Sequence, residues 1–205
     1  RMKFVENIIA DNQYFKETMP KNQIVLHHTA GGGNAKNVIH GWNFNPERIG
    51  TAFVIDSEGI IFKAFEPQYW AWHLGLKTNS NSKLNKHSIG IEVCNWGQLI
   101  ERDGKYYNYI NKEVHAEQVV QMPEFRGFKY YHAYNNKQLS AVKELVLYLA
   151  EQFKIDLTYN NDMWDISTAA LGGKPGLWTH VSYRKDKNDM SPQTLLIDTL
   201  TNLNK

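Results

Sequence analysis

Residues 24–33 read Ile-Val-Leu-His-His-Thr-Ala-Gly-Gly-Gly, and this stretch decides the fold. A short apolar run of this kind predicts a buried strand that leads into a glycine-rich turn. His27 and His28 stand at the end of the expected strand, which is where polar side chains of α/β proteins tend to form sites. Taken alone, the pair is equally typical of a capped strand end.

Further strands are expected after this one. The run Thr-Ala-Phe-Val-Ile at 51–55 and the apolar run at 60–65 predict a hairpin, because residues 56–59 (Asp-Ser-Glu-Gly) are turn formers. The run Ser-Ile-Gly-Ile-Glu-Val-Cys at 88–94 predicts another buried strand.

Two amphipathic helices complete the expected fold. Residues 137–153 carry apolar side chains at steps of three and four, which predicts one helix with a single apolar stripe. A second helix is expected after Pro192, since proline is favourable near a helix start. These elements predict an α/β fold, a single domain with a mixed central β-sheet flanked by α-helices. The side chains expected to face inward are Leu139, Val142, Leu145, Val146, Leu149 and Phe153 in the first helix, and Leu195, Leu196, Leu200 and Leu203 in the second.

The chain has 205 residues, which is enough for one domain with a full core and short for two. We therefore expect a single domain over 1–205. Residues 1–22 are interpreted as a polar lead-in with one short helix. Residues 98–135 are rich in tyrosine and are interpreted as an irregular, elaborated insertion with a small hairpin at 102–105.

Composition excludes several classes of protein. The net charge of +2 is far from the strong positive charge of a nucleic-acid binder. Cys94 is the single cysteine, so no internal disulfide can form. No run approaches the roughly 18 apolar residues of a membrane helix, and acidic residues near the start leave no visible signal peptide. We expect a monomer without nucleic-acid partner or membrane insertion, made in the cytoplasm with an unknown export route.

Histidines and carboxylates suggest a metal site. His180 lies in the segment 178–192, which gathers cations and carboxylates in an expected loop, although a solvated charged turn is the alternative. Zinc favours histidine nitrogen and carboxylate oxygen, and catalytic zinc sites keep three protein ligands and one open position. His27, His180 and either Asp186 or Asp189 supply such a set.

Glu92 is an unusual residue for its position. It interrupts the otherwise apolar strand at 88–94, where a carboxylate is costly unless it faces a polar site or a partner. One interpretation is an edge strand with Glu92 facing water. The functional interpretation is a general base next to a metal site.

Four segments occur together in the order of a known family. They are residues 24–30, Ala-Trp-His-Leu-Gly at 71–75, Ser-Ile-Gly-Ile-Glu-Val at 88–93, and 180–192, which ends in Lys-Asn-Asp-Met-Ser-Pro. Together they resemble the amidase-2 family of N-acetylmuramoyl-L-alanine amidases. This family includes phage endolysins, muropeptide-recycling amidases and animal peptidoglycan recognition proteins.

The resemblance implies roles for individual residues. Zn2+ would be bound by His27, His180 and Asp189, and Lys187 would stabilise the oxyanion. Some phage members carry a catalytic tyrosine at the position of Thr51, whereas members without it carry a glutamate that matches Glu92. Glu92 therefore resembles the base, which accepts the proton of the attacking water and passes it to the leaving amine.

The resemblance also implies a substrate and a place of action. The substrate would be peptidoglycan or its muropeptides, cut between N-acetylmuramic acid and L-alanine, and the protein would act on the bacterial cell wall. Trp72, His73 and Asn95 are candidate substrate-binding residues, with core packing as the alternative for the aromatic ring. The rival hypotheses are a peptidoglycan-binding module that does not cut, another zinc hydrolase, and an interaction protein with incidental histidines. The sequence has no His-Glu-x-x-His motif, so the common metallopeptidase arrangement is absent, which argues against another zinc hydrolase.

Overall fold

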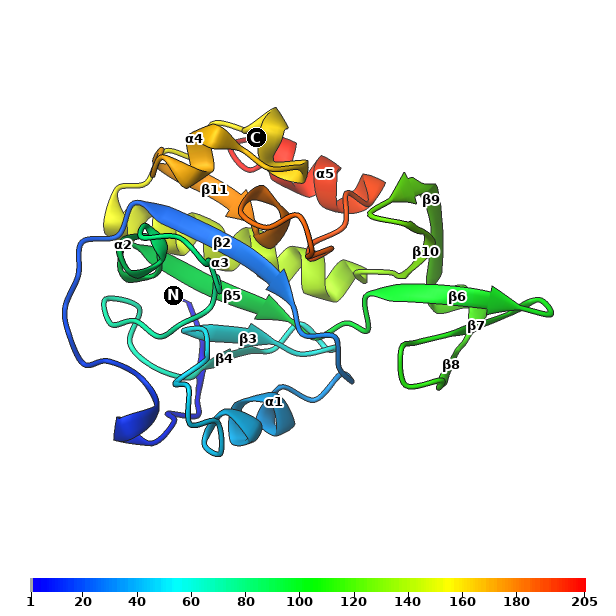
Figure 1. Cartoon of the computed structure of the whole chain (residues 1–205), viewed down its shortest axis with the longest axis horizontal. Coiled ribbons are helices and arrows are strands. Elements are labelled where there is room, and N and C mark those ends of the chain that lie inside the picture. Colours follow the sequence, from blue (N-terminus) through cyan, green and yellow to red (C-terminus); the bar gives the residue numbers. More distant parts are fainter. Residues whose placement is uncertain (1) are drawn as a thin grey trace.

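A six-stranded mixed sheet forms the core of the protein, in the strand order β1-β4-β3-β5-β2-β11 (Figure 1). The computed structural model describes residues 2–205. The core strands are β1 (Val5–Glu6), β2 (Gln23–His28), β3 (Phe53–Ile55), β4 (Ile61–Lys63), β5 (Ser88–Val93) and β11 (Gly176–Thr179). The predicted α/β fold with a mixed central sheet is confirmed.

Strand direction places the carboxyl ends of three strands together. β2 lies between β5 and β11 and runs parallel to both. β3 is parallel to β5 and antiparallel to β4, as the predicted hairpin requires. Because parallel strands end at the same edge of a sheet, the residues that follow β2, β5 and β11 are brought close to one another.

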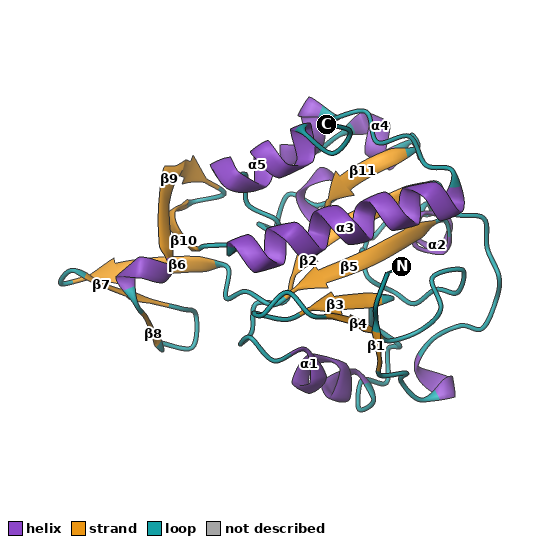
Figure 2. Cartoon of the chain, turned by 180° about the vertical axis from the view of Figure 1, so that it is seen from behind, coloured by secondary structure: helices purple, strands orange, loops and turns teal. Residues whose placement is uncertain are grey.

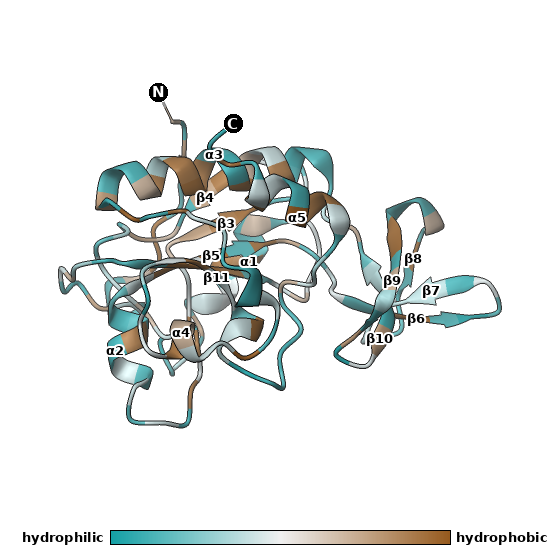
Figure 3. Ribbon diagram, turned by 90° about the horizontal axis from the view of Figure 1, so that it is seen from above, coloured by the Kyte–Doolittle hydropathy of each residue, from teal (hydrophilic) through white to brown (hydrophobic). Residues whose placement is uncertain are grey.

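Helices cover both faces of this sheet. Figure 2 shows α3 lying across one face, with α5 beside it, and Figure 3 shows α2 and α4 on the side opposite to α3. The helices are α1 (Ala35–Trp42), α2 (Asn81–Lys86), α3 (Asn136–Phe153), α4 (Thr168–Leu171) and α5 (Thr194–Thr201), and the short 3-10 helices are η1 (Asp11–Gln13), η2 (Ala116–Gln118), η3 (Asn161–Trp164) and η4 (His180–Ser182).

The apolar stripe of α3 packs on the sheet as predicted. A capping box at Asn135 starts the helix, and its first five predicted inward residues are buried, whereas Phe153 is only partly buried. Burying each such side chain stabilises the fold by about 1.5–3 kcal/mol.

The prediction for the last helix needs one correction. Leu196, Leu200 and Leu203 are buried, but Leu195 is 55% exposed. Consecutive residues of a helix point about 100° apart, so Leu195 and Leu196 cannot both face the core.

Residues 98–135 are not irregular as predicted. They form a second, five-stranded antiparallel sheet in the order β8-β7-β6-β10-β9, which stands apart from the core sheet in Figure 3. Its strands are β6 (Gln98–Arg102), β7 (Lys105–Tyr107), β8 (Glu113–Val114), β9 (Val119–Phe125) and β10 (Phe128–His132). The expected hairpin at 102–105 joins β6 to β7.

Residues 2–22 contribute a strand and buried side chains to the core, which a polar lead-in would not. β1 pairs with β4 at the edge of the core sheet, and Ile9 and Tyr14 are buried in the core. The expected short helix is the single turn of η1. Within residues 2–205, the structure contains no helix that is both long enough and apolar enough to span a membrane.

Candidate active site

Four candidate side chains come from the carboxyl edge of the core sheet and the loop beyond it. His27 lies near the end of β2, and its Cα partner on β5 is Glu92. His180 follows β11 directly and begins η4. Asp189 lies in the loop between η4 and α5. The parallel order of β5, β2 and β11 therefore brings together residues that are far apart in the sequence.

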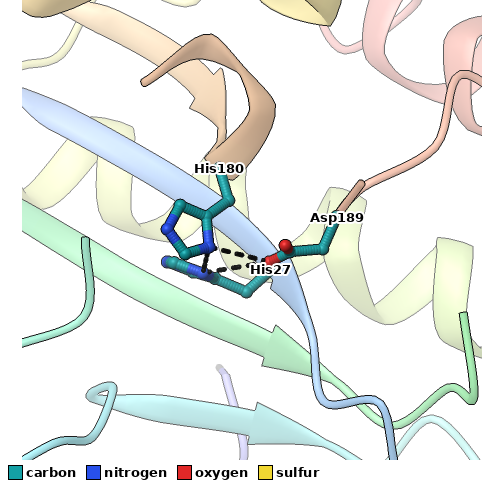
Figure 4. Close-up of side chains that lie close together, drawn as sticks. All are labelled: His27, His180 and Asp189. Atoms are coloured by element: carbon teal, nitrogen blue, oxygen red, sulfur yellow. Dashed lines mark hydrogen bonds and ion pairs between the residues drawn. The ribbon is translucent and has the colours of Figure 1, made fainter. Parts of the chain in front are cut away.

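His27, His180 and Asp189 form one compact cluster (Figure 4). The Nδ1 atoms of the two histidines lie 3.0 Å apart. Oδ2 of Asp189 lies 3.2 Å from Nδ1 of His27 and 3.1 Å from Nδ1 of His180. All three side chains are buried, and their ligand atoms lie within 4.8 Å of one another, as a shared metal ion would require.

Alternation along β2 explains why only the first histidine of the pair joins this cluster. Neighbouring residues of a strand point to opposite faces. His28 accordingly turns the other way, and its Nδ1 lies 2.8 Å from the hydroxyl of Tyr134. Of the two candidate aspartates, Asp189 lies beside the histidines, whereas Asp186 pairs with Arg184 at 2.6 Å on the surface.

The far nitrogens of both histidines are held by the segment that follows Trp72. Nε2 of His180 lies 2.9 Å from the carbonyl oxygen of Leu74, to which it must donate. Nε2 of His27 lies 2.9 Å from Nδ1 of His73, whose own Nε2 lies 2.8 Å from the hydroxyl of Ser88. If each Nε2 carries the proton, both Nδ1 lone pairs are free to face a metal, an arrangement typical of metal-binding histidines.

Protonation states also suit metal binding. Burial, with the charge of His180 adding to it, lowers the pKa of His27 to about 4. Burial alone would raise the pKa of Asp189, but His180 and His27 hold it well below its ordinary value. A neutral histidine and an ionised carboxylate are the forms that bind a metal. The donor set and its charges therefore fit zinc.

Glu92 is placed as a candidate base and not as a surface residue. β5 lies between β3 and β2, so the edge-strand interpretation is wrong. Oε2 of Glu92 is buried and has no hydrogen-bond partner among the described residues. Burial, with Asp189 adding to it, raises the pKa of Glu92 well above its ordinary value, while Lys187 acts in the opposite direction. A carboxylate with a buried oxygen that has no hydrogen-bond partner among the described residues is typical of a functional site.

A cavity of about 640 Å³ opens onto the cluster. Its walls include His27, His180 and Asp189 together with Glu92, Lys187, Trp72 and His73. Asn95 is not among the lining residues, since it is 1% exposed and its amide bonds the backbone of His132 and Gly97.

The comparisons with known proteins agree with this geometry. A family model described as N-acetylmuramoyl-L-alanine amidase matches residues 17–192. The chain belongs to the amidase-2 family. No curated protein matches the chain by sequence.

Several solved structures share the amidase fold. The structure of PlyL superposes with a TM-score of 0.59 at 14% identity, covering 100% of this chain and 98% of that one. A mutant endolysin from Bacillus subtilis gives 0.57 at 18% identity, covering 98% and 97%. The Staphylococcus aureus hydrolase AmiA in complex with its ligand gives 0.55 at 14% identity, covering 98% and 82%. At such low identity the likeness establishes the fold.

The sequence did not point to two further groups of this candidate site. The carbonyl of Leu74 orients His180, but a backbone group leaves no sequence signal. Ser88 holds His73, and it opens the strand motif at 88–93, so its place in that motif was the available signal.

Proposed function

We propose that the protein is a zinc-dependent N-acetylmuramoyl-L-alanine amidase. It hydrolyses the amide bond between N-acetylmuramic acid and L-alanine in peptidoglycan, as an enzyme of the endolysin or cell-wall-lytic type. The observation that carries this proposal is the buried cluster of His27, His180 and Asp189, which shares one cavity with Glu92. Oε2 of Glu92 has no hydrogen-bond partner within residues 2–205. Family membership supplies the chemical class of the substrate.

Zinc would be held by Nδ1 of His27, Nδ1 of His180 and Oδ2 of Asp189. When bound, such an ion acidifies water and polarises a carbonyl group. His73 and the carbonyl of Leu74 hold the two imidazoles in place, so their orientation is set before the ion arrives.

The remaining roles belong to side chains of the cavity wall. Glu92 accepts the proton of the attacking water and later delivers it to the leaving amine. Lys187 places a positive charge on the same wall, where it stabilises the charge that develops on the scissile carbonyl oxygen. Trp72 and His73 shape the cavity that receives the substrate.

We extend the proposal to the whole of residues 1–205 as one monomeric catalytic domain that acts on the bacterial cell wall. The second sheet of residues 98–132 is then an elaboration of that domain. Size-exclusion chromatography with light scattering tests the monomer, and a mass of two chains would contradict it.

Mass spectrometry of digested peptidoglycan tests the activity. The zinc-loaded protein should release intact stem peptides with a free alanine amine, and chelation should abolish the release. Glu92→Gln should lower kcat by about 100- to 10,000-fold while zinc stays bound. Glu124→Gln, an exposed glutamate of β9, is the matched control and should behave as the unchanged protein.

The result that would overturn the proposal is equally concrete. Zinc-loaded protein that binds peptidoglycan but releases no stem peptide would be a recognition module of the same fold. Near-normal turnover in Glu92→Gln would remove the assigned base.

A further inference from the structure

Arg126 joins the second sheet to the loop that carries Lys187 and Asp189. It sits in the turn between β9 and β10, and only 13% of its side chain is exposed. Its guanidinium group donates hydrogen bonds to backbone carbonyl groups of the segment 181–187. We call residues 181–189 the site loop.

Four backbone carbonyl groups of the site loop converge on this one side chain. Nη1 of Arg126 lies 2.9, 2.6 and 3.0 Å from the carbonyl oxygens of Arg184, Lys185 and Lys187. Nη2 lies 3.2 Å from the carbonyl oxygen of Val181 and 3.0 Å from Oδ1 of Asp165.

Converging carbonyl oxygens repel one another unless a donor lies between them. The planar guanidinium offers five N–H groups in a fixed fork, which a lysine ammonium cannot replace. Within residues 2–205, only one other side-chain hydrogen bond joins the second sheet to the site loop: Nδ2 of Asn188 donates to Oε1 of Gln98 at 2.8 Å. The guanidinium is therefore the principal hydrogen-bonded link between the second sheet and the site loop.

The backbone at Arg126 is unfavourable for an arginine. Phe125 and Phe128 are paired across the hairpin, so Arg126 and Gly127 form a two-residue turn. Their φ angles are 49° and 89°, a combination that favours asparagine and glycine. A side chain kept in a strained position points to a function for that side chain.

We propose that Arg126 is a positioning residue of the active site. By fixing the site loop, it sets the place of the Asp189 carboxylate and the Lys187 ammonium in the cavity. This inference rests on the proposed amidase function, and it makes the second sheet a clamp on the catalytic loop.

The variant Arg126→Asn separates positioning from stability, because asparagine suits the turn while it removes the clamp. We expect zinc affinity and kcat each to fall by about 10- to 100-fold, with KM little changed. The unfolding temperature of the metal-free variant should be maintained. Trypsin should cleave the metal-free variant faster after Arg184, Lys185 or Lys187.

Arg102→Asn is the matched control, since it removes the same charge from an exposed position of the same sheet. It should keep normal zinc affinity, kcat and trypsin resistance of the site loop. Arg126→Lys should restore only part of what Arg126→Asn loses, because a single ammonium cannot reach all four carbonyl groups.

Arg126→Asn with normal zinc affinity, kcat and trypsin resistance would overturn the inference. The inference would also be overturned if Arg126→Asn and Arg102→Asn lost zinc affinity and kcat equally while their unfolding temperatures fell. If the unchanged protein takes up no zinc or releases no stem peptide, the proposed function fails instead. The trypsin comparison on metal-free protein still decides the role of Arg126 in that case.

Discussion

Replacing Gly90 by alanine should disturb the active site through a contact that the structure defines. Gly90 lies in the middle of β5, beneath Thr51 and His73. A Cβ atom there would lie 2.7 Å from Cγ2 of Thr51, 3.1 Å from its Cβ and 3.1 Å from Nδ1 of His73. Carbon atoms in contact are normally about 3.5–4.0 Å apart, so Thr51 must retreat by about 1 Å. His73 must give way by a few tenths of an ångström.

The expected magnitude follows from this overlap. Overpacking a buried site costs about 1–3 kcal/mol of the free energy of unfolding, which for a domain of this size lowers the unfolding temperature by about 2–12 °C. Nδ1 of His73 lies 2.9 Å from Nε2 of His27, so the displacement reaches a proposed zinc ligand. A misplacement of 1 Å can cost about 100-fold in rate, so a shift of a few tenths of an ångström at His73 should lower kcat by a smaller factor, about 3- to 10-fold.

The assays are thermal unfolding by circular dichroism, zinc titration, and the release of stem peptides from peptidoglycan. Gly41→Ala is the matched control, because within the described residues no heavy atom lies within 4 Å of the added Cβ. It lies in the helix α1, where alanine should stabilise the protein by about 0.5–1 kcal/mol.

A second substitution tests the cause. Thr51→Ser removes Cγ2 but keeps the hydroxyl that donates to the carbonyl of Phe53 at 2.9 Å. Combined with Gly90→Ala, it should recover most of the lost stability and activity. Gly90→Ala with normal unfolding and turnover would refute the reasoning, and so would a double variant that is as damaged as Gly90→Ala alone.

Three further predictions concern pH, a buried lysine and the metal. Burial, with a neighbouring histidine adding to it, lowers the pKa of His132 to about 4 from its ordinary 6.5. Below pH 6.5 the unfolded chain therefore binds a proton at this side chain that the folded protein does not. The contribution of His132 to stability is complete above pH 6.5 and falls by about 3 kcal/mol toward pH 4, so in urea titrations metal-free His132→Asn should lose less stability over this range than the unchanged protein. Nζ of Lys21 is buried among three backbone carbonyl groups, to which it donates at 2.8, 2.8 and 3.1 Å. Lys21→Met should therefore lower the free energy of unfolding by about 2–4 kcal/mol in the same urea titrations. An unchanged unfolding midpoint would contradict this. Zinc at 100 times its Kd should stabilise the protein by about 2.7 kcal/mol, an effect that calorimetry should find lost in Asp189→Asn and retained in Asp186→Asn.

Local patterns predicted the parts of the fold in which each element carries its own signal. The apolar run before His27, the strand around Glu92 and the three- and four-residue steps of 137–153 all became the expected elements. Each pattern lies within one strand or helix, so its periodicity is readable without knowing the neighbours.

The second sheet left no such pattern, because few of its side chains are buried. Glu101, Lys105 and Lys129 are exposed on its strands, and Leu99 and Met122 are among its few buried apolar residues. In sequence, strands of this composition cannot be told from polar loops, because their strand conformation depends on pairing with neighbouring strands.

The sequence by itself determined the residue types of the candidate site and the strands and helices that bear them. Only the tertiary structure decided which of these residues meet, because the meeting depends on the parallel order of β5, β2 and β11. It separated Asp189 from Asp186, turned His28 away from the cluster, and brought Arg126 to the site loop across more than fifty residues of chain. Such contacts arise from how elements pack, and packing is a property of the whole chain that no short stretch of sequence carries.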